Sequence, residues 1–258
     1  MATSLPPSGD ASRQAGMERS FAEAIALVTG ASSGIGRAIA LALAAKGTSL
    51  CLVGRNRDRL AEVKTAAHSA GAREVLAVPA DLTDADDFER LTAAVGQVGD
   101  IDILVHCAGE YARAPLEAAA VTDMDALYAA NLRAPYRLTQ FFLPALRRRK
   151  GDILFINSTQ GLAASADVGQ FAATQHALKA VADSLRDEIN ATGVRVTTLH
   201  VGTTATPRQE RIFAATGRPY APDRLMQPDD VASAAIAVLG LPRSAEVTSL
   251  TIRPMQKP

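Results

Sequence analysis

The sequence of 258 residues contains no tryptophan and only two cysteines, Cys51 and Cys107. Two cysteines are too few for a disulfide framework, and they cannot form a four-ligand structural zinc site by themselves. The four histidines are scattered along the chain without the spacing of metal ligands. The sequence therefore predicts neither a disulfide-stapled scaffold nor a metal centre.

The chain also lacks net charge and long hydrophobic runs. Lys+Arg and Asp+Glu both total 27, so no basic excess attracts nucleic-acid phosphates or an anionic membrane surface. No apolar run approaches the ~20 residues that span a bilayer. Residues 1–20 are rich in Pro, Ser, Gly and Ala and lack the apolar core of a signal peptide, so we expect a flexible N-terminal tail. These absences predict a cytoplasmic protein without nucleic-acid or membrane partners.

Hydrophobic residues nevertheless make up 48% of the chain, which is enough for a large core. Short apolar runs alternate with alanine-rich segments of helical periodicity. The expected strands are 25–29, 49–53, 74–78, 101–105, 153–157, 194–200 and 247–252. The expected helices are 34–46, 57–70, 85–98, 124–149, 170–192 and 229–239. Because the strands are apolar without alternation, we expect an α/β fold in residues 21–258, a single doubly wound parallel sheet with helices on both faces.

The first expected strand leads directly into a glycine-rich turn, and a helix follows at once. The turn reads Gly30-Ala31-Ser32-Ser33-Gly34-Ile35-Gly36. Glycines are needed where a backbone closely approaches a pyrophosphate, and the helix N-terminus supplies amide donors and partial positive charge. The strand, turn and helix together predict a dinucleotide site.

Residues 29–36 resemble the TGxxxGIG turn of the short-chain dehydrogenases/reductases, whose Rossmann-type sheet has about seven strands. The resemblance extends over residues 22–255 and includes further landmarks in the family's order. These are Asp81-Leu82-Thr83 for the adenine pocket, Cys107-Ala108-Gly109 where Asn-Ala-Gly is usual, Asn131 in the fourth helix, and Gly202 to Thr206 for PGxxxT, with Val201 replacing the proline. The resemblance implies a nicotinamide cofactor.

The end of the second expected strand indicates which nicotinamide cofactor is preferred. An acidic residue there would hydrogen-bond the adenosine ribose and repel a 2′-phosphate. This position is Gly54, and Arg55 follows with a guanidinium that can bind a phosphate bidentately. Ser32, Ser33 and Asn56 could add donors. We therefore expect NADP(H) rather than NAD(H), the alternative being that Arg55 is a solvent-facing loop residue.

The resemblance also identifies the catalytic positions. In the family a Tyr exchanges the proton with the substrate oxygen, a Lys lowers the pKa of that Tyr and holds the nicotinamide ribose, a Ser orients the carbonyl, and an Asn supports a water relay. Asn131 and Ser158 match the last two. Phe171 lies 13 residues after Ser158, where the family carries Tyr, and Gln175 stands where it carries Lys.

These two replacements remove the proton chemistry of the family. Phe171 has no ionisable proton, and general acid–base catalysis is typically worth ~10²–10⁴-fold. Gln175 can still hydrogen-bond a ribose hydroxyl, but it carries no charge to lower the pKa of a neighbour. Tyr111, after the Ala108-Gly109 turn, is the best substitute acid, unless it only lines the substrate pocket. We expect His106, Cys107, His176 and His200 to be packing or surface residues.

Residues 203–227 form a polar, proline-containing stretch at the substrate-loop position of the family. Its Arg208, Arg211 and Arg218 could meet an acidic substrate, but scattered loop arginines are usually solvated, so no substrate class follows. Family members commonly assemble through the helices that match 124–149 and 170–192. The resemblance therefore implies a homodimer or homotetramer.

Three functional hypotheses follow. The first is a pseudoenzyme that binds NADP(H) and an unknown small molecule without ordinary ketone/alcohol redox turnover. The second is an NADP-dependent oxidoreductase with weak or substitute proton chemistry through Tyr111 or water. The third is a non-redox enzyme, for example a cyclase or isomerase, in which the cofactor is structural. We favour the first because Phe171 and Gln175 change together within an otherwise intact segment.

Overall fold

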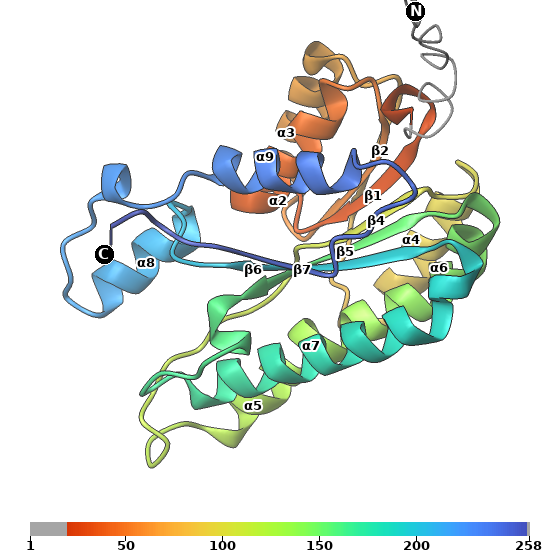
Figure 1. The fold of residues 1–258 in the computed structure, drawn as a ribbon. Helices are drawn as coiled ribbons and strands as arrows, with labels where there is room; N and C mark the ends of the chain where they lie inside the picture. Colours follow the sequence, from red (N-terminus) through yellow and green to blue (C-terminus); the bar gives the residue numbers. More distant parts are fainter. Residues whose placement is uncertain (1–19, 257–258) are drawn as a thin grey trace, which may run out of the picture.

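Seven parallel strands form one sheet in the computed structural model, which describes residues 20–256 (Figure 1). Apart from Ser20, the tail predicted for residues 1–20 lies outside this range. The strands are β1 (Ile25–Thr29), β2 (Ser49–Gly54), β3 (Val75–Pro79), β4 (Ile103–His106), β5 (Asp152–Ser158), β6 (Arg195–Val201) and β7 (Ser249–Ile252). The helices of at least eight residues are α2 (Gly34–Ala44), α3 (Arg57–Ala70), α4 (Ala85–Gly96), α5 (Val121–Tyr128), α6 (Ala134–Arg149), α7 (Gly169–Ile189), α8 (Pro207–Ala215) and α9 (Pro228–Leu239).

The helices cover both faces of the sheet, which confirms the doubly wound fold expected from the sequence. Helices α2, α3 and α9 pack on one face, and α4, α6 and α7 pack on the other (Figure 1). Successive strand residues point to opposite faces, so Val28 of β1 enters the first core and Leu27 enters the second. Both faces of each central strand are therefore apolar, as the unbroken hydrophobic runs predicted.

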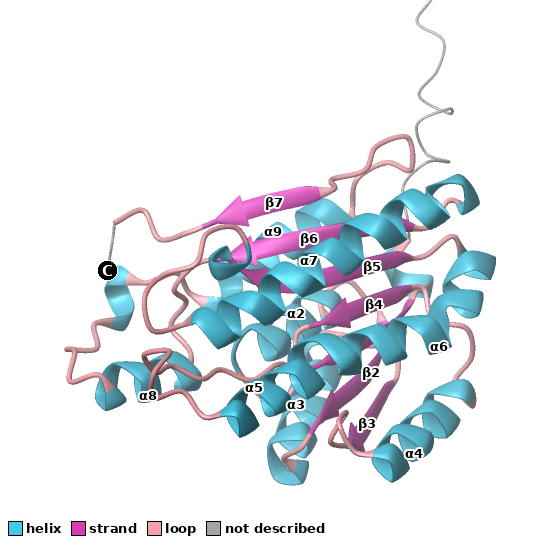
Figure 2. Ribbon diagram, turned by 90° about the horizontal axis from the view of Figure 1, so that it is seen from below, coloured by secondary structure: helices cyan, strands magenta, loops and turns pink. Residues whose placement is uncertain are grey.

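The strand order places a crevice at one edge of the sheet. The order is β3-β2-β1-β4-β5-β6-β7, so the chain reverses its winding direction between β1 and β4. In a parallel sheet all carboxyl ends meet at one edge, and ligands bind there at the point of reversal. The strand arrows in Figure 2 point toward this edge, on the side where α8 lies. The predicted cofactor-binding residues other than Gln175 follow these strand ends.

Two expectations about helices were wrong. The single helix predicted for 124–149 is instead α5, a π-helical segment (Ala129–Arg133) and α6, because a π turn admits an extra residue that apolar periodicity does not register. The stretch 203–227, expected as a loop, contains α8. Pro207 occupies its first turn, and the Thr206 hydroxyl accepts the Gln209 N–H at 3.2 Å. Proline at that position starts a helix rather than interrupting one.

The other boundaries differ from the expected ones by a few residues. Strand β4 begins at Ile103 and β7 at Ser249, each two residues later than predicted, and β6 ends at Val201 rather than at His200. Within residues 20–256, no helix combines the length and apolar character needed to cross a membrane.

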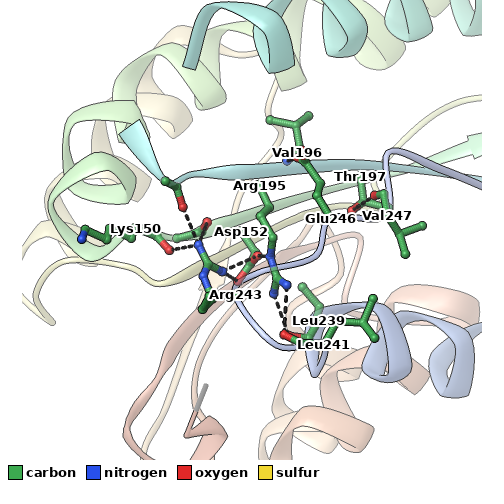
Figure 3. A network of polar contacts seen from close by, with 12 residues as sticks. Lys150, Asp152, Arg195, Val196, Thr197, Leu239, Leu241, Arg243, Glu246 and Val247 are labelled. Atoms are coloured by element: carbon green, nitrogen blue, oxygen red, sulfur yellow. Dashed lines mark hydrogen bonds and ion pairs between the residues drawn. The ribbon is translucent and has the colours of Figure 1, made fainter. Parts of the chain in front are cut away.

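A buried ionic network ties down the opposite edge of the sheet, at the amino ends of β5 and β6 (Figure 3). Asp152 accepts from Arg195 Nε at 2.6 Å and from Arg243 Nη1 at 2.9 Å. The Arg195 guanidinium also donates to the carbonyl oxygens of Leu239 and Leu241, each at 3.0 Å, where α9 ends. This network joins β5, β6 and the α9–β7 connection, and leaves the carboxyl edge free for ligands.

Candidate functional site

The glycine-rich turn between β1 and α2 is held against the end of β4. Gly30 has a φ of 67°, and a Cβ there would lie 2.8 Å from the Ala108 nitrogen. A Cβ on Gly36 would clash with the backbone of Gly30. Ser33, the N-cap residue of α2, makes no side-chain capping bond. The amide groups in the first turn of α2 therefore remain available to an anion in the crevice.

A cavity of about 630 Å³ extends along the carboxyl ends of β1 to β4. Most residues predicted to bind the cofactor line it. They are Gly30, Ser32, Ser33, Gly34, Ile35, Gly36, Arg55, Asn56, Asp81, Leu82, Ala108, Gly109 and Thr206. The remaining two, Gln175 and Gly202, line a second, adjoining cavity. We call these the large and the small cavity.

Close packing at the end of β2 keeps position 54 free of a side chain. A Cβ on Gly54 would lie 3.1 Å from the Ser32 hydroxyl oxygen. Asn56 caps α3 by accepting the Arg59 N–H at 2.8 Å, so its side chain is already engaged by the helix. Arg59 also lines the large cavity, and the sequence analysis missed it. Its position one helical turn after Arg55 was the available signal.

Arg55 forms an ion pair across the large cavity. Its Nη2 lies 2.7 Å from Glu110 Oε1, with the side chains 66% and 39% exposed. The loop that carries Glu110 is fixed by Asn131, whose Oδ1 accepts the Glu110 N–H at 2.7 Å and whose Nδ2 donates to the Glu110 carbonyl at 3.0 Å. Arg55 is thus directed across the crevice between β2 and β4.

The small cavity brings the predicted catalytic positions together. It has a volume of about 340 Å³ and is lined by Tyr111, Asn131, Ser158, Phe171 and Gln175, among others. Phe171 and Gln175 are 9% and 6% exposed and lie one turn apart on α7. The rings of Phe171 and Tyr111 meet edge to face, with centroids 5.0 Å apart. Residues from four separate parts of the chain therefore face one space.

Asn131 is positioned by the π-helical segment that interrupts the predicted long helix. Such segments are frequent at functional sites, because the extra residue redirects side chains. Besides its two hydrogen bonds to Glu110, Asn131 donates from Nδ2 to Thr174 Oγ1 on α7 at 3.1 Å. On the other wall, Asn157 Nδ2 donates to the Gln175 carbonyl at 3.0 Å, and the Ser158 hydroxyl accepts the Gln160 N–H at 3.1 Å. These bonds fix the backbone around Ser158 and Gln175.

The histidines and the cysteine near the site are held neutral or lie outside it. Burial lowers the pKa of His106 to about 3 and raises that of the Cys107 thiol to about 12. Burial also lowers the pKa of His200, whose Nδ1 lies 3.3 Å from the Ser158 carbonyl oxygen. His176 is exposed and lines neither cavity. Tyr111 is the phenol that faces Phe171.

No group of three or more His, Cys, Asp or Glu residues suited to a metal ion occurs in the described part of the chain. The sequence analysis missed several polar residues that line the small cavity, including Arg113, Asn157, Gln160 and Ser165. Asn157 directly precedes Ser158, and this adjacency was a usable signal. Gln160 lies in a short 3-10 helix (Thr159–Gly161) and the other two lie on loops, and no local pattern marks any of the three.

Comparisons with known proteins agree with this geometry. A family model described as short chain dehydrogenase matches residues 24–217. An uncharacterized oxidoreductase of Staphylococcus epidermidis is 32% identical over 235 residues, which cover 90% of this chain and 98% of the relative.

Two solved structures combine sequence identity with a similar fold. The alcohol dehydrogenase from the archaeon Thermococcus sibiricus, complexed with 5-hydroxy-NADP, has a TM-score of 0.81 and 30% identity, covering 91% of this chain and 98% of its own. A 3-oxoacyl (acyl-carrier-protein) reductase from Agrobacterium tumefaciens C58 with NADP bound has a TM-score of 0.76 and 27% identity, covering 89% and 93%.

Proposed function

The chain belongs to the short-chain dehydrogenase family, and we propose that it binds NADP(H) in the large cavity but lacks the proton-transfer pair for ordinary ketone/alcohol turnover. The observation that carries this proposal is the contrast between the two cavities. The large one retains the features of a dinucleotide site, while Phe171 and Gln175 line the small one together with Ser158. The protein is then a pseudoenzyme of oxidoreductase descent.

The large cavity fits a dinucleotide through its backbone. The first-turn amides of α2 suit a pyrophosphate, and the close approach at Gly30 and Gly36 leaves room for one. On the family pattern, Asp81 and Leu82 hold the adenine, and Ala108 and Gly109 lie along the ribose. Gln175, Gly202 and Thr206 are then on the nicotinamide side.

The end of β2 favours NADP(H) over NAD(H). No carboxylate occupies position 54, and Arg55 and Arg59 both line the cavity, where their guanidinium groups could bind a 2′-phosphate. Glu110 now pairs with Arg55, so binding exchanges one anion for another. The NADP-type ligands in the Thermococcus and Agrobacterium proteins support the same cofactor class.

The small cavity supports binding better than catalysis. A bound nicotinamide would supply a hydride donor or acceptor. Ser158 could orient a carbonyl, but Phe171 offers no proton and Gln175 no charge. Asn131 already serves Glu110 and Thr174. These residues can hold a small molecule beside the cofactor without completing its reduction.

One observation favours a second candidate function. The Tyr111 ring contacts Phe171 inside the small cavity, so its hydroxyl is the available substitute acid for an oxidoreductase with weak proton chemistry. In that case turnover would depend on Tyr111.

Titration of the unmodified protein with NADPH and, separately, NADH tests the cofactor proposal. We expect micromolar binding that favours NADPH, and about tenfold weaker NADPH binding in Arg55→Gln with little change for NADH, because a charged hydrogen bond to the 2′-phosphate is lost. Arg224→Gln, at an exposed arginine outside both cavities, is the matched control. Equal affinity for both cofactors, or no binding of either, would contradict the proposal.

A further inference from the structure

Three arginines from separate parts of the chain line the small cavity. Arg113 lies on the loop after β4, Arg208 in the first turn of α8, and Arg218 just beyond that helix. We call them the arginine rim. Arg208 and Arg218 are solvent-exposed, as expected for loop arginines, but the fold brings them to one cavity with Arg113.

The arginine rim leaves the small cavity with excess positive charge. Arg113 Nη2 lies 3.0 Å from Asp167 Oδ2, so its charge is offset in part. Arg208 donates to the Gly109 carbonyl oxygen, and the Arg218 guanidinium carbon lies 4.5 Å from the centre of the Phe213 ring. Neither Arg208 nor Arg218 forms an ion pair with a carboxylate of residues 20–256.

Among residues 20–256, the one carboxylate that lines the same cavity is already paired elsewhere. Glu110 pairs with Arg55 at 2.7 Å, and Arg55 lines only the large cavity. Glu110 forms no ion pair with Arg208 or Arg218. A guanidinium with no carboxylate partner at a cavity wall is suited to a ligand carboxylate, which it can bind through two parallel hydrogen bonds.

The remaining lining defines the rest of the ligand. Phe171, Leu178 and Ile212 offer an apolar surface, while the Ser158 hydroxyl provides a polar point on another wall. The volume of about 340 Å³ lies at the small end of the range for ligand pockets. The lining thus combines a cationic rim, an apolar wall and several hydroxyl groups, among them that of Ser158.

We propose that the small cavity binds a small carboxylic acid that also carries an oxo or hydroxyl group. The arginine rim holds the carboxylate, the apolar wall contacts the carbon chain, and Ser158 hydrogen-bonds the second oxygen. This inference rests on the proposed function, because it names the class of small molecule held beside the cofactor. It assigns no chemical step to that molecule.

Calorimetric titration with carboxylic acids and their uncharged methyl esters tests the inference. The probes are pyruvate, 4-oxopentanoate and 6-oxoheptanoate, each paired with its methyl ester, added to cofactor-free protein and to protein with NADPH. We expect at least one acid to bind at least tenfold more tightly than its ester, because the ester lacks the charge that the arginine rim recognises. Equal binding of acids and esters, or no acid binding up to about 10 mM, would overturn the inference.

Substitutions of Arg218 show whether the arginine rim is responsible. Arg218 lines the small cavity alone, whereas Arg208 lines both. Arg218→Met keeps an apolar stem over Phe213 and removes the charge, so we expect at least a tenfold loss of acid binding with ester binding unchanged. Arg218→Lys should recover part of the loss, and Arg224→Gln should bind acid as the unmodified protein does. Unchanged acid binding in Arg218→Met would refute the role of the rim.

The NADPH titration of the same samples separates the two proposals. Acid binding that depends on Arg218 in a protein that binds no NADPH would overturn the proposed function and uphold the arginine rim. NADPH binding without acid selectivity would uphold the proposed function and overturn the arginine rim.

Discussion

Phe171 and Gln175 lie one turn apart on α7 with both side chains facing the small cavity. Neither is a surface substitution, since they are 9% and 6% exposed. The Phe171 ring packs edge to face against Tyr111. The phenylalanine at position 171, where the family pattern has a tyrosine, is therefore held by a packing partner. At the scale of single residues, both positions are closely packed, and neither side chain carries an ionisable proton.

The Arg55–Glu110 pair gives a prediction for cofactor affinity. Arg55 must exchange Glu110 for the 2′-phosphate, so Glu110→Gln should strengthen NADPH binding by about threefold, the range of an exposed ion pair. Fluorescence titration measures this, with Glu117→Gln, at an exposed glutamate outside both cavities, as control. Unchanged or weaker NADPH binding in Glu110→Gln would show that the pair does not compete with the cofactor.

Individual site residues differed in how well the sequence could predict them. Gly30, Gly34 and Gly36 lie close together in the chain, and their spacing reflects a local geometric need, so the glycine-rich turn was predictable. Arg113 and Arg218 are more than one hundred residues apart, and their approach depends on how the loop after β4 and the segment after α8 pack. The sequence could not predict the Arg55–Glu110 pair either, because its two residues also lie far apart in the chain.

The packing of strand β4 in the core fixes the position of the site residues that follow it. Strand β4 carries His106, which stacks on Phe155 of β5 with ring centroids 4.8 Å apart and is hydrogen-bonded to Thr139 of α6 at 2.8 Å. The chain immediately after His106 forms the wall between the two cavities. The packing of β4 therefore sets the position of Ala108 and Gly109.

The buried His106 predicts a loss of stability in acid. Burial lowers its pKa to about 3, against about 6.5 in an unfolded chain. Between these values the unfolded state binds a proton that the native state does not, so stability falls as pH drops from about 6.5 toward 3. His106→Gln can keep the bond to Thr139 without titrating. Between about pH 7 and 5 its melting temperature should fall less than that of the unmodified protein.

The comparison concerns how the melting temperature changes with pH, not its value at any one pH. His106→Gln loses the stacking on Phe155, so a lower melting temperature at neutral pH is expected. His200, whose pKa burial also lowers, leaves a residual slope of the same sign. Identical pH slopes in both proteins would mean that His106 does not contribute.

Helices illustrate where sequence patterns lose information. The apolar pattern predicted α3 with its observed bounds, because Asn56 and Gly71 cap it at both ends. The same reasoning merged α5 and α6, since the π segment keeps the chain helical while shifting its phase. It also overlooked α8, which begins with a proline followed by a run of polar residues. Both errors fall on elements that line the site.

At the scale of the whole molecule, an exposed apolar surface supports the expected homodimer or homotetramer. Met124 and Tyr128 of α5 and Tyr136 and Phe141 of α6 are between 46% and 52% exposed. Apolar side chains gathered on neighbouring elements mark interaction surfaces. The helices around residues 124–149 are those through which the family commonly assembles.

Light scattering coupled to size-exclusion chromatography tests this assembly. We expect a dimer or tetramer for the unmodified protein and a shift toward monomer for Tyr136→Arg, because a charge would be buried without a partner. Leu162→Arg, at an exposed apolar residue outside these helices, should not change the mass. A monomer at all concentrations would contradict the expected assembly.

The expected cytoplasmic location rests on the sequence alone.

We propose that the molecule keeps a cofactor site and lacks the proton-transfer pair. The test is to measure NADPH oxidation with a panel of carbonyl compounds for the unmodified protein and for Phe171→Tyr with Gln175→Lys. Tyr111→Phe in the unmodified background is the companion variant, because loss of a background rate there would favour the substitute-acid function.

We predict negligible turnover by the unmodified protein, and a rate at least ~10²-fold higher once the pair is restored, since general acid–base catalysis is typically worth that much. Cofactor binding should be similar in both proteins. Turnover by the unmodified protein as fast as that of the restored variant would contradict the account, as would a restored variant that binds NADPH but stays inert across the panel.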